Sequence, residues 1–198
     1  DDARPPSRTA PRLLALTAHA RVTLAADAPA MDPASRQALW AQLATQARAR
    51  PEVVGAAPYA EIQALAMHSP EMLPVQLRGI DPGAEPAVTE AADSLVQGRL
   101  ADLVPGSDRV IVGSVIAKLL GLGVGDPMTL LVPGVGPDGA PQPRLREFAI
   151  AGIFEVGLQD HDGVLVLADL QDVRALTADA PRAAGLRLKF RDALQAPA

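Results

Sequence analysis

The sequence predicts an α+β fold in which one subdomain is inserted into another. Strand–helix–strand patterns stand near both ends of the chain, and the stretch between them starts at an abrupt turn sequence, Asp81-Pro82-Gly83. Short apolar runs separated by Gly and Pro indicate strands, whereas few segments have helical spacing. We expect residues 13–82 and 158–198 to form the first subdomain and residues 83–157 the inserted one. Residues 1–12 are rich in Pro and Arg and are expected to be flexible.

The opening unit is expected to run strand, helix, strand, strand. Asp32-Pro33 marks the helix start, because Asp caps free amides and Pro has no amide to leave unpaired. The helix should continue to about Arg50, where Pro51 ends it. The segments expected as strands are residues 20–25, 53–67 and 75–80.

The inserted part should contain two helices and three strands. The helices are expected at 86–96 and at 114–120, the second ending at Gly121. A short buried strand fits 110–112, and the strands at 128–132 and 148–154 are placed to pair as a long hairpin.

The closing part is expected to form a strand, a helix and a last strand. The first strand covers 164–167, and Asp169 caps the helix. The last strand covers 185–190 and alternates in polarity. Its expected inward residues are Leu186, Leu188 and Phe190, and its expected outward residues are Arg187 and Lys189.

Composition excludes several kinds of function. The formal net charge is −5 and no basic stripe is visible, so we expect no nucleic-acid partner. Aromatic residues make up only 3% of the chain, which argues against stacking platforms for sugars or single strands. The absence of cysteine excludes thiol catalysis, disulfides and Cys-zinc sites. No apolar stretch is long enough to span a membrane, and a polar start without Met suggests a soluble piece of a larger protein.

The residues that suggest chemistry have simpler interpretations. The glycines of 121–127 follow a helix and precede a strand, which is the reverse of a phosphate-binding loop, so we expect a helix cap and turn. Asp160-His161-Asp162 offers adjacent side chains that rarely converge on one metal ion. Glu61 and Glu155 are interpreted as strand carboxylates, although the sequence does not exclude an acid–base pair. We therefore predict no catalytic residues, no metal site and no cofactor.

The arm, defined here as Pro133–Pro143, is the unusual segment. It holds four prolines and three glycines in eleven residues, so it cannot form a regular ladder and should project from the hairpin. Two interpretations stay open: a disordered tip, and a partly rigid hook that offers backbone groups and small apolar side chains to a partner. Two arginines at its base either pair with acidic groups across an interface or form a solvated face. The candidate partner-binding residues are Pro133, Gly134, Val135, Gly136, Pro137, Pro141, Pro143, Arg144 and Arg146.

Several stretches, in a shared order, resemble a known family. Val75–Pro82 is similar to the RGIDP stretch of the lipoprotein-releasing ABC permeases, LolC and LolE. The other matching stretches are Val54–Tyr59, Gln97–Leu100, Val110–Gly113, Val124–Asp126, Pro143-Arg144 with Phe148, Ala151–Glu155 and Gly185–Leu188. The resemblance extends over about Leu13–Asp192, nearly the whole chain.

The resemblance implies a MacB-like periplasmic domain of an inner-membrane protein, lying between the first two membrane helices. Such a domain has a Porter-like α/β subdomain and an inserted Sabre-like subdomain that carries a protruding β-hairpin. The permease works with a partner permease subunit and a cytoplasmic LolD-type ATPase. It extracts lipoproteins from the inner membrane and passes them to the periplasmic carrier LolA.

In LolC-like members the protruding hairpin, the hook, engages LolA together with a patch at its base. By position, residues 133–143 match the hook, and Arg144 and Arg146 fall near the base patch. In LolE-like members the corresponding loop is associated with the lipoprotein substrate, so both assignments stay open. The alternative is another MacB/FtsX-type permease, active in efflux or cell-wall hydrolase regulation, with a different partner.

Overall fold

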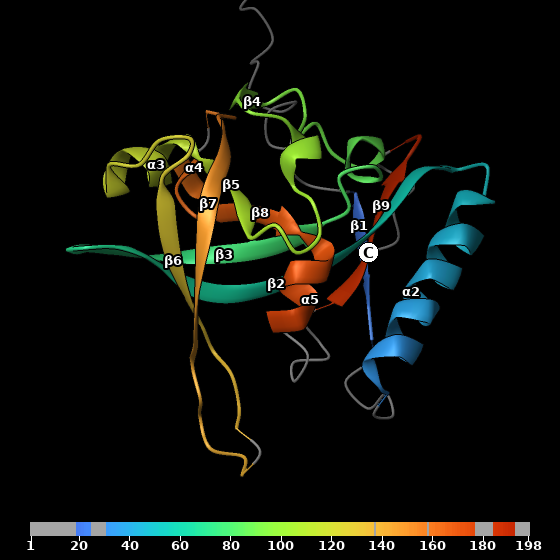
Figure 1. Cartoon of the computed structure of the whole chain (residues 1–198). Coiled ribbons are helices and arrows are strands. Elements are labelled where there is room, and N and C mark those ends of the chain that lie inside the picture. The colour runs from blue at the N-terminus through green and yellow to red at the C-terminus, as the bar shows by residue number, and fades with distance from the viewer. Residues whose placement is uncertain (1–18, 25–30, 137, 158, 177–183, 193–198) are drawn as a thin grey trace, which may run out of the picture.

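The computed structural model describes residues 19–24, 31–136, 138–157, 159–176 and 184–192 (Figure 1). The expected flexible residues 1–12, Ala25 and Pro137 lie outside these ranges. The strands are β1 (Ala20–Thr23), β2 (Val53–His68), β3 (Glu71–Ile80), β4 (Leu95–Gln97), β5 (Arg109–Gly113), β6 (Pro127–Val132), β7 (Arg144–Phe154), β8 (Leu165–Asp169) and β9 (Ala184–Phe190). The helices are α2 (Pro33–Arg48), α3 (Ser114–Leu120), α4 (Gln159–Asp162) and α5 (Leu170–Leu176), and the 3-10 turns are η1 (Glu85–Ala87) and η2 (Leu100–Asp102).

The described strands join in one sheet that closes on itself. The order is β1-β9-β2-β3-β8-β5-β7-β4, and β6 pairs with both β2 and β7. The strands β2, β3, β8, β5, β7 and β6 therefore form a ring. Within it β3 lies parallel to β8 and β5 parallel to β7, and the other pairs are antiparallel. A closed ring leaves its member strands without a free edge, which protects them from pairing with other chains.

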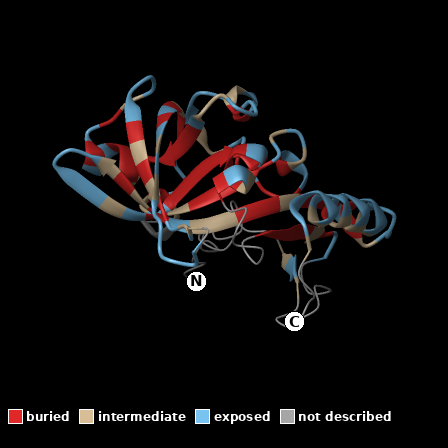
Figure 2. Ribbon diagram, turned by 60° about the horizontal axis from the view of Figure 1, so that its bottom comes forward, coloured by how far each residue is buried: buried red, intermediate tan, exposed pale blue. Residues whose placement is uncertain are grey.

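The main core fills this ring. Alternate residues of each strand point inward, as the period of two requires, and Leu77, Val112, Leu130 and Val166 are all fully buried. Helices α3 and α5 contribute further apolar side chains to the same cluster. Burying each such side chain stabilises the fold by roughly 1.5–3 kcal/mol. Figure 2 shows buried residues concentrated on the strands.

Helix α2 packs on the sheet outside the ring. Its buried residues Trp40 and Ala44 contact the apolar face of β9, while most of its remaining surface is exposed (Figure 2). The predicted cap is confirmed, since the Asp32 carboxylate accepts a hydrogen bond of 3.0 Å from the Ser35 amide. No helix within the described ranges has the length and hydropathy needed to cross a membrane.

The local predictions were mostly confirmed. Helix α3 ends at Gly121, whose φ of 66° is the left-handed conformation expected of a helix cap. Asp169 precedes α5 and accepts the Gln171 amide at 2.7 Å. The strands expected at 53–67 and 148–154 are present and are longer than predicted.

The helix predicted at 86–96 was wrong. This stretch contains the end of the 3-10 turn Glu85–Ala87, a loop and the start of β4. Val88 and Ala91 are buried although they lie outside a helix, and β4 pairs with β7. Packing and strand pairing with distant residues override the local helix preference here.

The outward orientation predicted for Arg187 was also wrong. Its side chain is only 1% exposed and donates two hydrogen bonds to the Glu85 carboxylate. The face of β9 that was expected to meet solvent is covered by η1. Gly55 permits this approach, because a Cβ there would lie 2.0 Å from the Ala87 carbonyl oxygen.

Strands from both expected subdomains meet in this sheet, because β8 pairs with β3 on one side and β5 on the other. The division into a Porter-like and a Sabre-like part stays a prediction.

Candidate docking surface

The arm continues the hairpin formed by β6 and β7. The two strands pair from Pro127 and Ala149 up to Val132 and Arg144. Beyond them the backbone hydrogen bonds across the arm include Gln142 N–H to Gly134 O and Gly136 N–H to Ala140 O, both 2.8 Å. The prolines at 133, 141 and 143 have no amide to donate, so the ladder is incomplete, as expected.

A tight turn closes the tip of the arm. The Gly139 amide donates to the Gly136 carbonyl at 3.0 Å, and the Ala140 amide donates to the Asp138 carboxylate at 3.1 Å. Gly139 has a φ of 79°, a conformation that glycine adopts at little cost. Figure 1 shows the arm extending well beyond the rest of the molecule. The candidate residue Pro137 lies outside the described residues.

One face of the hairpin is apolar and exposed. Leu131 lies opposite Leu145, and Val135 lies opposite Pro141. Because side chains alternate along strands, Pro133 and Pro143 belong to the same face. Leu145 is 63% exposed and Val135 is 50% exposed. The described residues of this face on the two sides of the arm, Leu131 to Val135 and Pro141 to Leu145, include no charged side chain.

The apolar face continues onto two neighbouring strands. Leu131 lies opposite Leu65 of β2, which in turn lies opposite Pro74 of β3. One row further from the tip, Met67 lies opposite Met72, which is 55% exposed. We call this surface the apolar strip; it consists of Leu65, Met67, Met72, Pro74, Leu131, Pro133, Val135, Pro141, Pro143 and Leu145.

The two candidate arginines lie on the opposite face of the hairpin. Arg144 stands opposite buried Val132, and its guanidinium donates to the Leu176 carbonyl at 3.1 Å. Arg146 forms an ion pair of 2.6 Å with Asp108. Both arginines thus attach the base of the arm to the body of the protein. The arm residues and the arginines are adjacent in space but face different sides.

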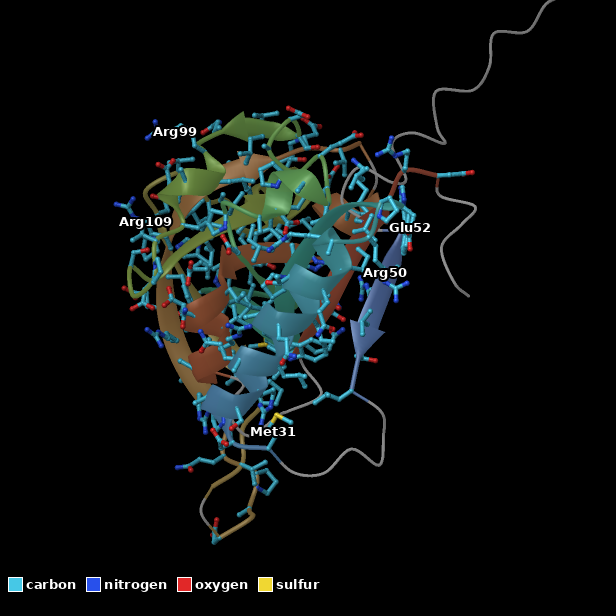
Figure 3. All side chains as sticks on the ribbon, turned by 90° about the vertical axis from the view of Figure 1, so that its right-hand side faces the viewer. Met31, Arg50, Glu52, Arg99 and Arg109 are labelled. Carbon is cyan, nitrogen blue, oxygen red and sulfur yellow. The ribbon has the colours of Figure 1, made fainter. Side chains whose placement is uncertain are left out.

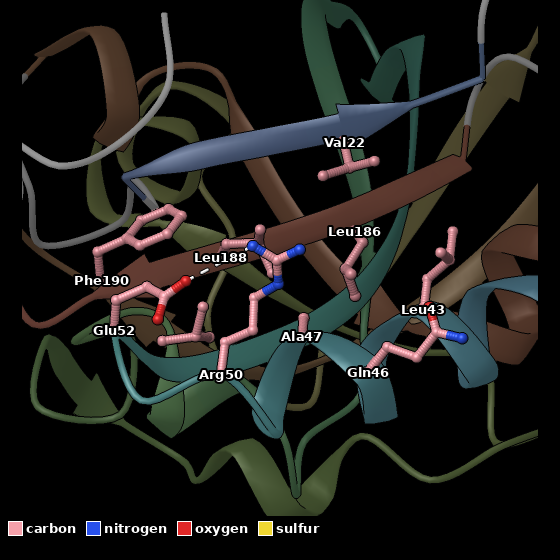
Figure 4. A pocket seen from close by; sticks show the side chains of 10 residues that line it. Val22, Leu43, Gln46, Ala47, Arg50, Glu52, Leu186, Leu188 and Phe190 are labelled. Atoms are coloured by element: carbon pink, nitrogen blue, oxygen red, sulfur yellow. Dashed lines mark ion pairs between the residues drawn. The ribbon is translucent and has the colours of Figure 1, made fainter.

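A second feature is a groove of about 670 Å3 between α2, β1 and β9 (Figure 4). Leu186, Leu188 and Phe190 form its floor, and Val22, Leu43 and Ala47 line its walls. Arg50 and Glu52, 3.6 Å apart, form an ion pair at its rim. Figure 3 shows this pair beside β1, on the side of the molecule opposite Arg99 and Arg109. The lining offers apolar contact and no nucleophile.

Two of the other polar candidates, Asp162 and Glu61, have structural partners. The Asp162 carboxylate accepts the amides of Val156 and Gly157, each at 2.9 Å. Glu61 pairs with Arg78 at 2.6 Å and with Arg21 at 3.2 Å. Among the described residues, no three His, Asp or Glu side chains gather as a metal site.

Sequence reasoning missed the part of the apolar strip outside the arm. The signal was present in the strand pattern, because Leu131 and Leu145 occupy the positions that alternate with the buried residues of β6 and β7. The register that brings Leu65 beside Leu131 joins residues 66 positions apart (131 − 65), and Met72 follows because it pairs with Met67 of the same strand β2.

The chain matches the family model of the MacB-like periplasmic core domain over residues 7–197. It is 37% identical to the lipoprotein-releasing system transmembrane protein LolC of Neisseria meningitidis over 161 residues, which are 80% of this chain and 39% of that protein. It is 34% identical to LolC of Xylella fastidiosa over 183 residues, or 91% of this chain and 42% of the relative. For LolE of Haemophilus influenzae the identity is 26% over 93% of this chain and 44% of the relative.

Two solved structures share the fold. The extracellular domain of the transporter YknZ from Gram-positive bacteria has a TM-score of 0.52 at 14% identity, and covers 78% of this chain and 74% of that one. The periplasmic region of MacB from Actinobacillus actinomycetemcomitans has a TM-score of 0.50 at 12% identity, with 77% and 64% covered. The chain spans about two fifths of the length of the curated relatives it matches.

Proposed function

Because the chain belongs to the family of MacB-like periplasmic core domains, we propose that it is the periplasmic domain of a lipoprotein-releasing ABC permease. The similarity to LolC proteins over most of the chain supports this proposal. The full permease would combine this domain with membrane helices, a partner permease subunit and a LolD-type ATPase. The domain itself is non-catalytic and acts by binding.

The docking part of the proposal is that the arm binds a LolA-type carrier. The observation that carries it is the exposed apolar strip on a projecting hairpin. Soluble proteins seldom expose contiguous apolar surface unless it serves an interaction. The tip residues Val135 and Pro141 are small and stiff, so burying them costs little side-chain entropy. Handover of a lipoprotein would then follow docking of the carrier beside the permease.

The LolC-like role is favoured over the LolE-like role. The LolC relatives reach 34–37% identity, whereas the LolE relative reaches 26%. In a LolC-like role the apolar strip faces the carrier, and Arg144 and Arg146 contribute by holding the arm to the body. The alternative remains a related permease for efflux or cell-wall hydrolase regulation, which would bind a different partner.

The test is a binding titration of a LolA-type carrier against this chain. Val135→Asp and Leu145→Asp each place a charge in the apolar strip, and we expect each to weaken binding at least about tenfold, because an unpaired charge would be buried at the interface. Val96→Asp is the matched control, since the exposure of Val96, 55%, lies between those of Val135 and Leu145, and Val96 lies in β4, which pairs with the other end of β7.

Thermal unfolding should show that all three variants remain folded. Saturable binding by wild type and by Val96→Asp, with loss in both strip variants, supports the arm as the docking site. Equal binding by all four proteins would show that the carrier docks elsewhere. A wild-type chain that does not bind the carrier would contradict the carrier proposal itself.

A further inference from the structure

A pocket of about 380 Å3 lies where β3 and β8 end side by side. The two strands are parallel, and Ile80 stands opposite Asp169, so their carboxyl ends meet at the same edge of the sheet. Asp81 and Asp169 therefore reach the pocket from neighbouring strands. The lining residues are Gln37, Ala41, Pro58, Asp81, Pro82, Leu103, Pro105, Asp169, Leu170, Gln171 and Arg174.

The Asp169 carboxyl is buried with unused hydrogen-bonding capacity. The residue is 4% exposed, and its carboxylate accepts hydrogen bonds from the backbone amides of Gln171 and Asp172. A carboxylate has about four acceptor positions, so this one can still accept a further donor. Burial raises the pKa of this carboxyl, and the nearby Asp172 and Asp81 charges act in the same direction. An acceptor held in this way gains from any donor that enters the pocket.

Arg174 lines the same pocket. Its side chain is half-buried, and no ion pair or hydrogen bond joins it to another described residue. Burial lowers the pKa of its guanidinium, while Asp169 and Asp81 oppose that effect from a distance. The pocket thus presents two carboxylates and one guanidinium that do not neutralise one another by direct contact.

The remaining walls are apolar and poor in donors. Pro58, Pro82 and Pro105 have no amide to offer, and Leu103 and Leu170 present only hydrocarbon. Such walls suit an aliphatic chain that carries a charge at its end, because long basic side chains bury their methylene stems and extend the charged head to a partner.

We propose that this pocket binds a lysine or arginine side chain of an extended polypeptide segment. The basic head pairs with the carboxylates of Asp169 and Asp81, and the stem packs against the prolines and leucines. Arg174 donates to a carbonyl or carboxylate of the same segment. Two carboxylates against one guanidinium give the pocket a net negative charge, which favours a cationic ligand over a phosphate or a free acid.

This site differs from the proposed carrier-docking surface. The pocket is lined by residues of α2 and α5, by Pro58 of β2 and by the loop that follows η2. The apolar strip lies on residues 65 and 67 of β2, on β3, β6 and β7 and on the arm. The family-like stretch Val75–Pro82 ends in the pocket, so the proposal gives its last two residues a binding role. Neither site depends on the other.

The experiment is a titration of the isotope-labelled chain with acetyl-Gly-Arg-Gly-amide, followed by amide chemical shifts. We expect saturable shifts centred on Leu103, Leu170 and Gln171. The matched peptide has citrulline in place of arginine, which keeps the shape and removes the charge. It should bind at least about tenfold more weakly, since a charge-assisted hydrogen bond is about twice as strong as a neutral one.

Asp169→Asn tests the pocket without removing the helix cap, because the amide oxygen can still accept from Gln171. It should weaken binding of the arginine peptide at least about tenfold. Asp126→Asn is the control, since Asp126 makes the same kind of amide contact, to Gly123, in a different turn.

Three results would overturn the proposal. One is the absence of saturable shifts up to about 10 mM peptide. A dissociation constant above that concentration means less than about 3 kcal/mol of binding free energy. Another is equal affinity for the arginine and citrulline peptides. The third is shifts that map away from the pocket, or that persist unchanged in Asp169→Asn. The carrier is not part of this experiment, so its outcome is separate from that of the docking test.

Discussion

Removing the Glu85 carboxylate would leave Arg187 buried without a counter-charge. The two side chains are 2% and 1% exposed, and both guanidinium Nη atoms donate to the carboxylate. The Thr89 hydroxyl also donates to Glu85 at 2.8 Å, and the Arg187 guanidinium lies 5.5 Å from the centre of the Tyr59 ring. No water replaces these contacts readily, because the pair lies between η1 and β9.

We expect Glu85→Ala to lower the free energy of unfolding by about 3–5 kcal/mol, which is the usual cost of breaking a buried pair from one side. For a chain of this length that corresponds to a fall in Tm of about 6–20 °C. Urea unfolding followed by circular dichroism measures the first quantity, and a thermal scan measures the second.

The double variant Glu85→Leu with Arg187→Met removes both charges. It therefore distinguishes the cost of one unpaired buried charge from the cost of changing the packing around the pair. Replacing both charges by apolar groups of similar size is often neutral or stabilising, so the double variant should be more stable than Glu85→Ala. The reasoning would be refuted if Glu85→Ala cost less than about 1 kcal/mol. It would also be refuted if the double variant were as unstable as the sum of its single changes.

Three further changes test the arm and the pocket. Gly139→Val forces a β-branched residue into a φ of 79° and should cost about 1–2 kcal/mol at the tip, seen as faster amide exchange at Ala140 with little change in Tm. Arg146→Ala removes a partly exposed ion pair with Asp108 and should lower the unfolding free energy by at most about 1 kcal/mol; a larger loss in urea unfolding would show that the pair does more than hold the arm. The raised pKa of Asp169 means that its ionised form destabilises the folded state. This destabilisation is relieved as the pH falls through the folded pKa and the carboxyl becomes protonated. Asp169→Asn should therefore stabilise the chain relative to wild type at pH 7, and this difference should disappear below the unfolded pKa; a constant difference across that range would contradict the assignment.

The predictions that succeeded depend on local signals. Asp32 and Gly121 mark helix ends because a cap acts within one turn, and strand alternation is visible in any five residues. The failures depend on contacts between distant segments. Arg187 is outward-facing by alternation, and only the approach of Glu85, 102 residues away, buries it. The closure of the ring by β6 and the pocket at Asp169 likewise require pairings that no short window contains.

The apolar strip joins a rigid base to a less constrained tip, and this difference bears on how a partner would bind. Leu65, Leu131 and Leu145 lie on strands of the closed ring, and Arg146 ties the start of β7 to the body. Beyond Pro133 the described arm is held by few cross-strand hydrogen bonds. A partner that contacts the base meets a surface already in its bound shape, so little ordering entropy is lost there. Contacts at the tip must order the arm as they form. Truncating Leu145 should therefore weaken binding mainly through lost contact area, whereas a stiffer tip should strengthen binding with no new contact at all.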